Sequence, residues 1–250
     1  MPPAAPEPPA APGAPGTPRL MEAIDATWPP AEFAALGAWT LRRGAGGGQR
    51  VSAASTGDAT ADPGAAAEAM RAWGQAPLFR VGEGQAALDD RLAGAGYRRH
   101  DPVVLYAAPV AALADGRDET ARVIRVRAPL AIVDEIWLGG GIGPGRRAVM
   151  DRAPDPKMTL LARASDRPAG VAFVGIDRDI AMIHAIEVVP AHRRLGAGEI
   201  LLRGAASFAA EHGAAWLTLA VTEANATARA LYAKLGMGLA GRYHYRLGAE

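Results

Sequence analysis

The chain has 250 residues, of which 50% are hydrophobic and 21% charged, and its formal net charge is +1. This length allows one large or two small domains with cores of their own, and so small a net charge excludes a strong overall field for a nucleic acid or an anionic membrane. Cysteine is absent, which excludes disulfides, thiolate metal sites and a cysteine nucleophile and fits a cytoplasmic location. No apolar run approaches the roughly 20 residues that a membrane-spanning helix needs.

The first twenty residues, MPPAAPEPPAAPGAPGTPRL, are rich in proline and alanine. Such a composition cannot bury enough apolar surface to form a core. The stretch has neither a basic start nor a continuous apolar segment, so it lacks the pattern of a secretory signal. We expect residues 1–20 to form a disordered, solvated tail rather than a proline-rich ligand for another domain, and Met21 is a second candidate start.

Residues 21–110 alternate helical and strand patterns and are expected to form a small α/β unit. The first helix ends at Pro29 and Pro30, because proline cannot continue a helix. The glycine-rich stretch 44–48 joins two strands and favours a flexible hairpin over a phosphate-binding loop. The predicted helices are 20–28, 65–74 and 84–97, and the predicted strands are 38–44, 49–55, 77–82 and 101–110.

A polar connection at residues 111–120 separates this unit from a second one at residues 121–250. Three successive strands with short turns between them predict an antiparallel meander. The predicted strands are 121–126, 158–164, 170–176, 181–189, 215–221 and 243–247, and the helices are 130–138, the end of 139–153, 197–212 and 225–236. Strands joined by crossover helices predict an α/β fold with a mixed, mostly antiparallel sheet flanked by helices.

A weak internal repeat relates the two halves. Residues 87–92, followed by Gly-Ala-Gly, parallel residues 230–235, followed by Gly-Met-Gly with one residue inserted, and a strand follows each block. In this alignment Asp89 stands where Tyr232 stands in the second block. A generic amphipathic helix that ends at glycine explains the pattern nearly as well.

The stretch EVVPAHRRLGAGEILL, residues 187–202, places two glycines where a helix should begin. Glycine costs about 0.5–1 kcal/mol relative to alanine in a helix, so bare backbone must be needed there. A helix N-terminus exposes unpaired N–H groups and a partial positive charge, and glycines let a phosphate approach them. Together with Arg193 and Arg194, the loop 193–198 predicts a phosphate or pyrophosphate site.

The spacing of this loop excludes two common phosphate-binding motifs. A Walker loop needs lysine before serine or threonine, and a Rossmann fingerprint needs a third glycine where Leu201 stands. The pattern V-x-P-x-x-R-x-x-G-x-G, from Val188 to Gly198, instead resembles the pyrophosphate motif R/Q-x-x-G-x-G/A of the GNAT superfamily of acetyl-CoA-dependent N-acetyltransferases. A second GNAT signature, an asparagine followed by A-x-x-L-Y-x-K-L-G, matches Asn225 and residues 228–236.

The resemblance covers roughly residues 121–247, and the first half resembles the degenerate GNAT-like units of tandem members. It implies a splayed sheet, in which the fourth and fifth strands separate around the pantetheine arm of acetyl-CoA. Arg194 departs from the family, where glycine is common at this position. The implied cofactor contacts are the backbone of Glu187, Val188 and Val189, the motif residue Arg193, the amides of Arg194, Leu195, Gly196, Ala197 and Gly198, and Asn225.

Acetyl transfer needs a neutral amine and a proton for the leaving thiolate. The resemblance places Tyr232 near the thioester sulfur, where its phenol would donate that proton. Glu187 is the candidate general base, and its alternative is a solvated or ion-paired strand residue. His184 lies three positions earlier and is expected on the opposite face, so one of the two faces the acceptor. The histidines lack metal-ligand spacing, and no metal is expected.

The family also implies that residues 135–147 cover the acceptor. We expect Trp137 in the core, while Arg146 and Arg147 would either meet an acidic substrate or be solvated. The sequence thus predicts an N-acetyltransferase that moves an acetyl group from acetyl-CoA to a primary amine of a small molecule or peptide, by direct transfer in a ternary complex. The alternative is a non-catalytic acyl-CoA-binding or assembly protein. No nucleic acid or membrane partner is expected, and a homodimer is left open.

Overall fold

The computed structural model describes residues 9–114, 122–128, 130–164 and 166–248. Within them, one mixed sheet has the strand order β3-β10-β4-β9-β8-β7-β6-β5, and β1 and β2 form a separate hairpin. The strands are β1 Glu32–Leu36, β2 Trp39–Arg43, β3 Leu78–Gly82, β4 Arg98–Pro109, β5 Val123–Val126, β6 Lys157–Ala164, β7 Arg167–Asp177, β8 Ile180–Val188, β9 Trp216–Thr222 and β10 Gly238–Leu247. The helices are α1 Thr17–Thr27, α2 Pro63–Ala72, α3 Ala86–Gly94, α4 Val110–Leu113, α5 Ala131–Gly139, α6 Pro144–Arg152, α7 Ala197–Glu211 and α8 Ala226–Lys234, with 3₁₀ turns η1 Gln49–Val51 and η2 Pro190–His192. The predicted α/β fold with a mostly antiparallel sheet is confirmed.

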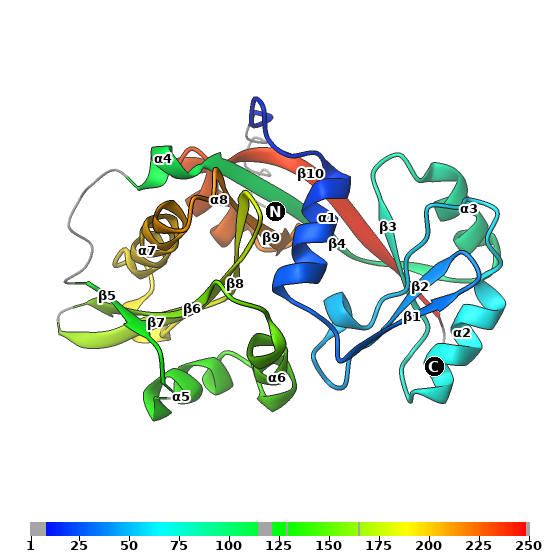
Figure 1. Cartoon of the computed structure of the whole chain (residues 1–250), viewed down its shortest axis with the longest axis horizontal. Coiled ribbons are helices and arrows are strands. Elements are labelled where there is room, and N and C mark those ends of the chain that lie inside the picture. The colour runs from blue at the N-terminus through cyan, green and yellow to red at the C-terminus, as the bar shows by residue number, and fades with distance from the viewer. Residues whose placement is uncertain (1–8, 115–121, 129, 165, 249–250) are drawn as a thin grey trace.

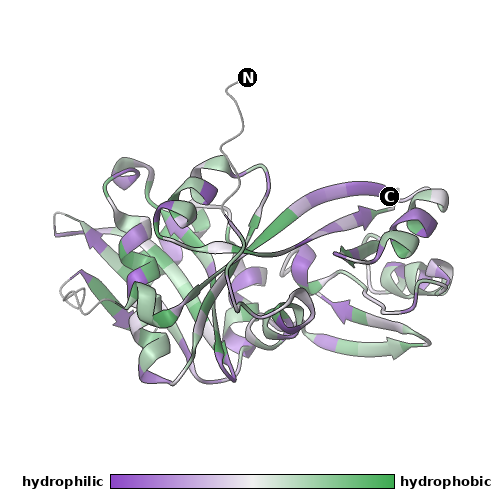
Figure 2. Cartoon of the chain, turned by 90° about the horizontal axis from the view of Figure 1, so that it is seen from above, coloured by the Kyte–Doolittle hydropathy of each residue, from purple (hydrophilic) through white to green (hydrophobic). Residues whose placement is uncertain are grey.

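The larger lobe is built on an antiparallel meander of β5, β6, β7 and β8. Both faces of this meander are covered, which explains its long apolar runs. Along β7, Ala172 and Val174 pack in the cluster that contains α7, whereas Val171 and Phe173 pack with residues of α5 and α6. Figure 1 shows α7 and α5 on different sides of these strands, and Figure 2 colours much of the lobe's interior as hydrophobic.

The neighbouring strands β8 and β9 separate along their length. They run parallel, but their paired register covers only residues 180–183 opposite residues 216–219. This is the splay that the GNAT resemblance implies. In addition, the pairing of β8 with β7 shifts between His184 and Glu187, and Ala185 there has the left-handed φ of 50°. Such a bulge adds one residue to the strand, so His184 and Glu187 lie on the same side of it.

The two halves of the chain share the large sheet by exchanging their last strands. β10 lies between β3 and β4, and β4 pairs with β9 of the second half. Figure 1 shows β4 and β10 running together from one lobe to the other. The boundary predicted at residues 111–120 therefore separates two halves of the sequence that complete one another in space. Most of that connection, residues 115–121, lies outside the described residues.

The units β3–α3–β4 and β9–α8–β10 repeat the same order of elements. Both helices have nine residues, and α8 begins 140 residues after α3. Each helix is followed by a glycine in the left-handed region, Gly96 and Gly236. Aligned by these ends, Leu92 takes the position of Tyr232, so the sequence alignment that placed Asp89 there is wrong. It matched leucines of two amphipathic helices, whereas the glycine caps fix the true register.

The stretch that follows the glycine-rich loop is not the predicted strand. Residues 49–51 form η1, and Ala54 and Ser55 make only isolated bridges. The prediction of a strand at residues 49–55 is wrong. Val51, Ala53 and Ala54 are all fully buried, so neighbouring side chains do not alternate between core and solvent as they would in a half-buried strand. The hairpin is instead formed by β2 with β1, which the sequence did not indicate.

Part of the predicted tail packs against the fold. The N–H of Ala11 donates to the carbonyl of Leu239 over 3.0 Å. α1 begins earlier than expected, with Pro18 in its first turn, where the missing N–H of proline costs no hydrogen bond. Residues 9–20 therefore do not form the expected disordered tail, although several of them are exposed, because extended segments and first helical turns both accept proline. The first eight residues lie outside the described part of the chain.

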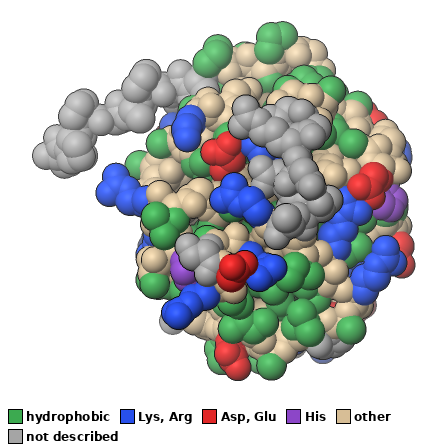
Figure 3. Space-filling view, turned by 90° about the vertical axis from the view of Figure 1, so that its left-hand side faces the viewer, with side chains coloured by type: hydrophobic (Ala, Val, Ile, Leu, Met, Phe, Trp, Pro, Cys, Tyr) green, Lys and Arg blue, Asp and Glu red, His purple; other side chains and the backbone are tan. Residues whose placement is uncertain are grey.

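The face at the β5 and α5 end of the molecule mixes apolar and charged side chains (Figure 3). Ile124, Leu130 and Leu138 are exposed at this end. Single exposed apolar residues are usual on protein surfaces. None of the helices in the described ranges is both long enough and apolar enough to cross a bilayer.

Candidate active site

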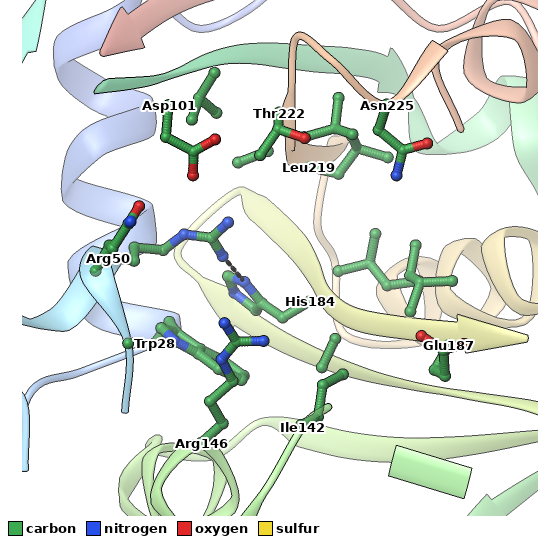
Figure 4. Close-up of a pocket in the computed structure, with 18 of the residues that line it drawn as sticks. Trp28, Arg50, Asp101, Ile142, Arg146, His184, Glu187, Leu219, Thr222 and Asn225 are labelled. Atoms are coloured by element: carbon green, nitrogen blue, oxygen red, sulfur yellow. Dashed lines mark hydrogen bonds between the residues drawn. The ribbon is translucent and has the colours of Figure 1, made fainter. Parts of the chain in front are cut away.

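A cavity of about 490 Å³ opens where β8 and β9 separate, and both halves of the chain line it. The second half contributes the ends of β8 and β9, the connection between α5 and α6, and one face of α8. The first half contributes the residue after α1, the glycine-rich loop with η1, and the start of β4. The charged residues that line the cavity are Arg50, Asp101, Arg146 and Glu187 (Figure 4).

One edge of β8 faces this cavity without a strand partner. Its other edge stays paired with β7 as far as Val188, while its pairing with β9 has already ended. Because peptide groups inside a sheet normally pair with a neighbour, this edge can pair with an extended ligand that carries amides. Of the predicted contacts, Glu187 and Val188 lie on it. Val189 instead donates its N–H to Ala169 and accepts from His192.

The predicted phosphate loop leads from β8 into α7. Gly196 is the N-cap of α7 and has the left-handed φ of 86°, and no side chain caps the helix. The N–H of Ile200 donates to the carbonyl of Gly196 over 3.0 Å. The preceding N–H groups, those of Ala197, Gly198 and Glu199, have no partner inside the helix. An uncapped helix start of this kind suits an anion.

Three other residues of the loop differ in backbone conformation, exposure and packing. Arg194 has a left-handed φ of 64°, which explains why glycine is common at this position in the resembling family. Leu195 is 58% exposed. A Cβ added to Gly198 would lie 2.8 Å from Leu231 of α8. Gly198 therefore allows the two helices to approach each other, whatever it contributes to a ligand.

Glu187 lies near the end of β8 with its carboxylate beside Gly140. A Cβ on Gly140 would overlap that carboxylate, so the connection between α5 and α6 needs glycine there to leave room for it. Arg193 places its Nη2 3.4 Å from Glu187 Oε1 and its Nε 3.3 Å from the carbonyl of Val188. The Glu187 side chain is 19% exposed and Arg193 61%, so the pair lies at the mouth of the cavity.

Helix α8 supplies the two residues of the second motif. Asn225 caps the helix, since its Oδ1 accepts the N–H of Ala228 over 3.1 Å, and it also lines the cavity. Tyr232 is 6% exposed, and its ring packs against that of Tyr106 with 5.6 Å between the centroids. Burial, assisted by Tyr106, raises the pKa of Tyr232 to about 12. The phenol is therefore protonated throughout the physiological range.

His184 does not lie on the opposite face from Glu187, because the bulge brings both to the cavity. Its Nδ1 is 3.1 Å from Arg50 Nη1, and its Nε2 is 2.8 Å from Thr27 Oγ1. Arginine can only donate, so Nδ1 accepts and Nε2 carries the proton, while the Thr27 hydroxyl donates to the carbonyl of Ala23. Burial, together with the charge of Arg50, lowers the pKa of His184 well below its usual value. His184 stays neutral and holds Arg50, which leaves Glu187 as the better candidate base.

Two tryptophans support the bulge. Trp137 is buried, as expected, and its Nε1 donates to the carbonyl of Ala185 over 2.9 Å. Trp28 stacks against His184 with 4.9 Å between the ring centroids. The bulged segment is thus fixed from α5 on one side and from the end of α1 on the other.

Sequence reasoning missed Arg50 and Asp101 as site residues and left the role of Arg146 open. Asp101 has a left-handed φ of 46°, which is uncommon for a residue with a side chain and is frequent at functional sites. The available signal was the glycine-rich stretch 44–48. The predicted flexible hairpin is instead packed tightly beside the cavity.

Comparisons with known proteins indicate a family and a fold. Residues 134–237 match the model of the acetyltransferase (GNAT) family. Streptothricin acetyltransferase of Streptomyces lavendulae is 48% identical over 59 residues, which cover 24% of this chain and 31% of that protein. The chain therefore spans about a third of the length of this relative.

Two solved structures share the fold over nearly the whole chain. A GCN5-related N-acetyltransferase from Kribbella flavida superposes with a TM-score of 0.70 at 18% identity, covering 95% of this chain and 97% of that one. A tandem GNAT protein from the clavulanic acid biosynthesis pathway gives a TM-score of 0.55 at 16% identity, covering 98% and 91%. Both likenesses extend over the first half as well as over the residues that match the family model.

Proposed function

We propose that this chain, whose residues 134–237 match the GNAT family of acetyltransferases, moves the acetyl group of acetyl-CoA to a primary amine, directly within a ternary complex. The chain has no cysteine, so an acyl-enzyme on a thiol is not available to it. The observation that carries the proposal is the unpaired edge of β8 beside the uncapped start of α7.

These two features fit the two ends of an acyl-CoA. An extended arm with amide groups would pair with the backbone of β8 at Glu187 and Val188, as an added strand does. A pyrophosphate would accept from the N–H groups of residues 197–199, with Arg193 and Arg194 beside it. The side-chain amide of Asn225 would donate to the arm from the other side of the gap. Val189, whose backbone groups are already bonded, has no part in this proposal.

In the proposed reaction the amine nitrogen attacks the thioester carbonyl, forming the C–N bond, and the C–S bond then breaks. An alkylammonium with a pKa near ~10 must first lose a proton. Glu187 accepts it, directly or through one water, and passes it to solvent at the mouth of the cavity. The nitrogen loses a second proton to solvent by the same route as the amide forms, and this proton balances the one that the thiolate takes up. The products are an N-acetylated amine, CoA and one proton for each charged amine consumed.

Tyr232 acts on the leaving sulfur as a hydrogen-bond donor. Its pKa of about 12 exceeds that of a thiol, about 8.5, so full transfer of its proton to the thiolate would be uphill by roughly 5 kcal/mol. A neutral phenol that donates a hydrogen bond in a buried site still stabilises charge as it develops on sulfur. The thiolate can then leave and take its proton from solvent.

Titration with acetyl-CoA, followed by a thiol-release screen, tests this function. We expect one acetyl-CoA bound per chain and thiol release with at least one class among amino acids, polyamines, peptides and streptothricin, the compound for which one relative is named. Binding without release across the screen would favour the alternative, a non-catalytic acyl-CoA-binding protein. Absence of binding would contradict both.

A further inference from the structure

Arg50 projects into the acceptor side of the cavity from the first half of the chain. Its guanidinium is anchored by the hydrogen bond to neutral His184 (Figure 4). The histidine accepts only one of the five guanidinium N–H donors. The anchor therefore fixes the orientation of Arg50 while leaving donors for a ligand.

Arg146 enters the same cavity from the first turn of α6 (Figure 4). A Cβ on Gly48 would lie 3.3 Å from its Nε, so the guanidinium lies against bare backbone of the glycine-rich loop. That loop also lies directly against α6, since a Cβ on Gly145 would overlap the carbonyl of Gly46. The glycines of both segments thus allow two arginines from different halves of the chain to line the same cavity.

Neither guanidinium forms an ion pair with another described residue. Among the described residues, no carboxylate lies within ion-pair distance of Arg50 or Arg146, whereas Arg147 next in the chain pairs with Asp134 at 2.7 Å. Glu187 is paired with Arg193 at the mouth. Within the described part of the chain, the two guanidinium groups that line the cavity therefore have no ion-pair partner.

Buried charge behind the cavity has the same sign. Arg42 and Arg80 are 2% and 6% exposed and share one carboxylate, that of Asp25. This leaves one net positive charge beneath Tyr243 and Tyr245, two tyrosines that line the cavity. Burial raises the pKa of Tyr245 well above its usual value, and Arg50 and Arg80 partly oppose that effect, so both arginines lie near this hydroxyl.

We infer that the acceptor is an amine that also carries a carboxylate or phosphate, which Arg50 and Arg146 bind. This inference rests on the proposed acetyl transfer and names its substrate class. Each guanidinium can bind an oxyanion through parallel charge-assisted hydrogen bonds. Asp101 and Glu187 lie on other walls of the cavity, where they suit the ammonium end of the same molecule.

Matched amines test this preference, because each pair differs in the anionic group. The pairs are β-alanine and propylamine, lysine and cadaverine, and phosphoethanolamine and ethanolamine. We expect kcat/KM for thiol release from acetyl-CoA to be about 10- to 100-fold higher for the anionic member of at least one pair. The first two pairs report on a carboxylate and the third on a phosphate.

Variants then assign the preference to the arginines. Arg50→Gln and Arg146→Gln should each reduce it by about 10-fold while leaving the Kd for acetyl-CoA unchanged, and Arg50→Lys should retain part of it. Arg147→Gln is the matched control, because Arg147 neighbours Arg146 but pairs with Asp134 outside the cavity. It should leave the preference as in the wild type.

The same amines are titrated into the CoA-saturated protein, so that the preference is measured even where no turnover follows. Turnover or binding that favours propylamine, cadaverine and ethanolamine, or that shows no preference in any pair, overturns the inference and leaves acetyl transfer intact. A preference that survives both glutamine variants overturns it as well. Failure of acetyl-CoA itself to bind would instead remove the proposed function, and this inference with it.

Discussion

The units β3–α3–β4 and β9–α8–β10 share their order, their helix length and their glycine cap, yet they treat the same position differently. In the first unit this position is Leu92, fully buried among apolar residues. In the second it is Tyr232, which reaches the cavity between β8 and β9. The same helix position thus contributes only to packing in the first unit, whereas in the second unit it presents a hydroxyl group to the cavity.

The gap beside each unit differs as well. In the first unit, Gln85 Nε2 donates to the carbonyl of Thr56 over 2.7 Å, and its Oε1 accepts the N–H of Gly82 over 2.8 Å. This side chain joins the end of β3 to Thr56, which directly follows the isolated bridges of Ala54 and Ser55. Its counterpart, Asn225, is one methylene shorter and caps its own helix. The gap is therefore closed in the first unit and open in the second.

The helix that follows each gap shows the same contrast. α2 is capped by the carboxylate of Asp62, which accepts the N–H of Gly64, whereas α7 begins at Gly196 without a side-chain cap. A capped helix start has less to offer an anion. In the first unit, Gln85 thus closes the gap and Asp62 caps the helix start, whereas in the second unit both remain open to a ligand.

Removing the hydroxyl that distinguishes the second unit should have the largest effect. Tyr232→Phe keeps the ring and its packing, and it should lower kcat by roughly 10²–10³ with little change in the Kd for acetyl-CoA, because only the transition state uses the donor. Steady-state thiol release measures this. Tyr106→Phe, at the neighbouring ring, is the control and should stay near wild type. A Tyr232→Phe enzyme within a few-fold of wild type would remove this residue from the mechanism.

Filling the uncapped helix start should abolish cofactor binding. Gly196→Val adds a branched side chain where the pyrophosphate is proposed to lie, and we expect the Kd for acetyl-CoA to rise about 10²-fold or more. Gly213→Val is matched to it, since Gly213 also has a left-handed φ, 75°, and open space around it, but follows the far end of α7. Both should lose about 1–2 kcal/mol of stability. Equal affinity in the two variants would contradict the assignment of the loop.

Asp89, which the sequence had aligned with Tyr232, has a structural role that pH should reveal. A hydrogen bond from Arg246, and a second from His244, outweigh burial and lower the pKa of Asp89 to about 2 from 3.8. A depressed carboxyl pKa stabilises the fold above about pH 4 and loses that effect as pH falls toward 2. Asp89→Asn should therefore cost roughly 2 kcal/mol at pH 7 and less near pH 3. Urea unfolding at several pH values measures this, and a pH-independent difference would refute it.

Opening the closed gap should affect only stability. Gln85→Ala removes the link between Thr56 and Gly82 and should cost about 1 kcal/mol, measured by chemical unfolding. Acetyl-CoA should still bind once per chain, because Asp62 continues to cap α2. Two acetyl-CoA molecules per chain of this variant would show that Gln85 alone had kept the first unit from binding.

The sequence indicated those parts of the protein that depend on local pattern. The meander of β6, β7 and β8 followed from apolar runs with short turns, and the glycine-containing loop before α7 and helix α8 followed from motifs with fixed spacing. Other features were invisible because they depend on distant contacts. The bulge at Ala185 breaks the period of two through a hydrogen bond from Trp137, and no local pattern reports it.

The proposed acceptor pocket was the least predictable part. Arg50 and Asp101 reach it only because the halves exchange β4 and β10, so the relevant neighbours lie more than a hundred residues apart in the chain. The glycine-rich stretch 44–48 signals either flexibility or close packing, and only the contact with α6 distinguishes them. The packing of residues 9–20 was missed for a related reason, since a proline-rich composition does not exclude an extended segment paired with an edge.

The central claim is that of two related gaps only the one in the second unit binds acyl-CoA. Hydrogen exchange with and without acetyl-CoA tests it on one sample. We predict slower exchange in residues 185–199 and 225–232, with no change in residues 54–64 and 78–86, which form the closed gap. Equal protection of both sets, or protection confined to the first, would contradict the account.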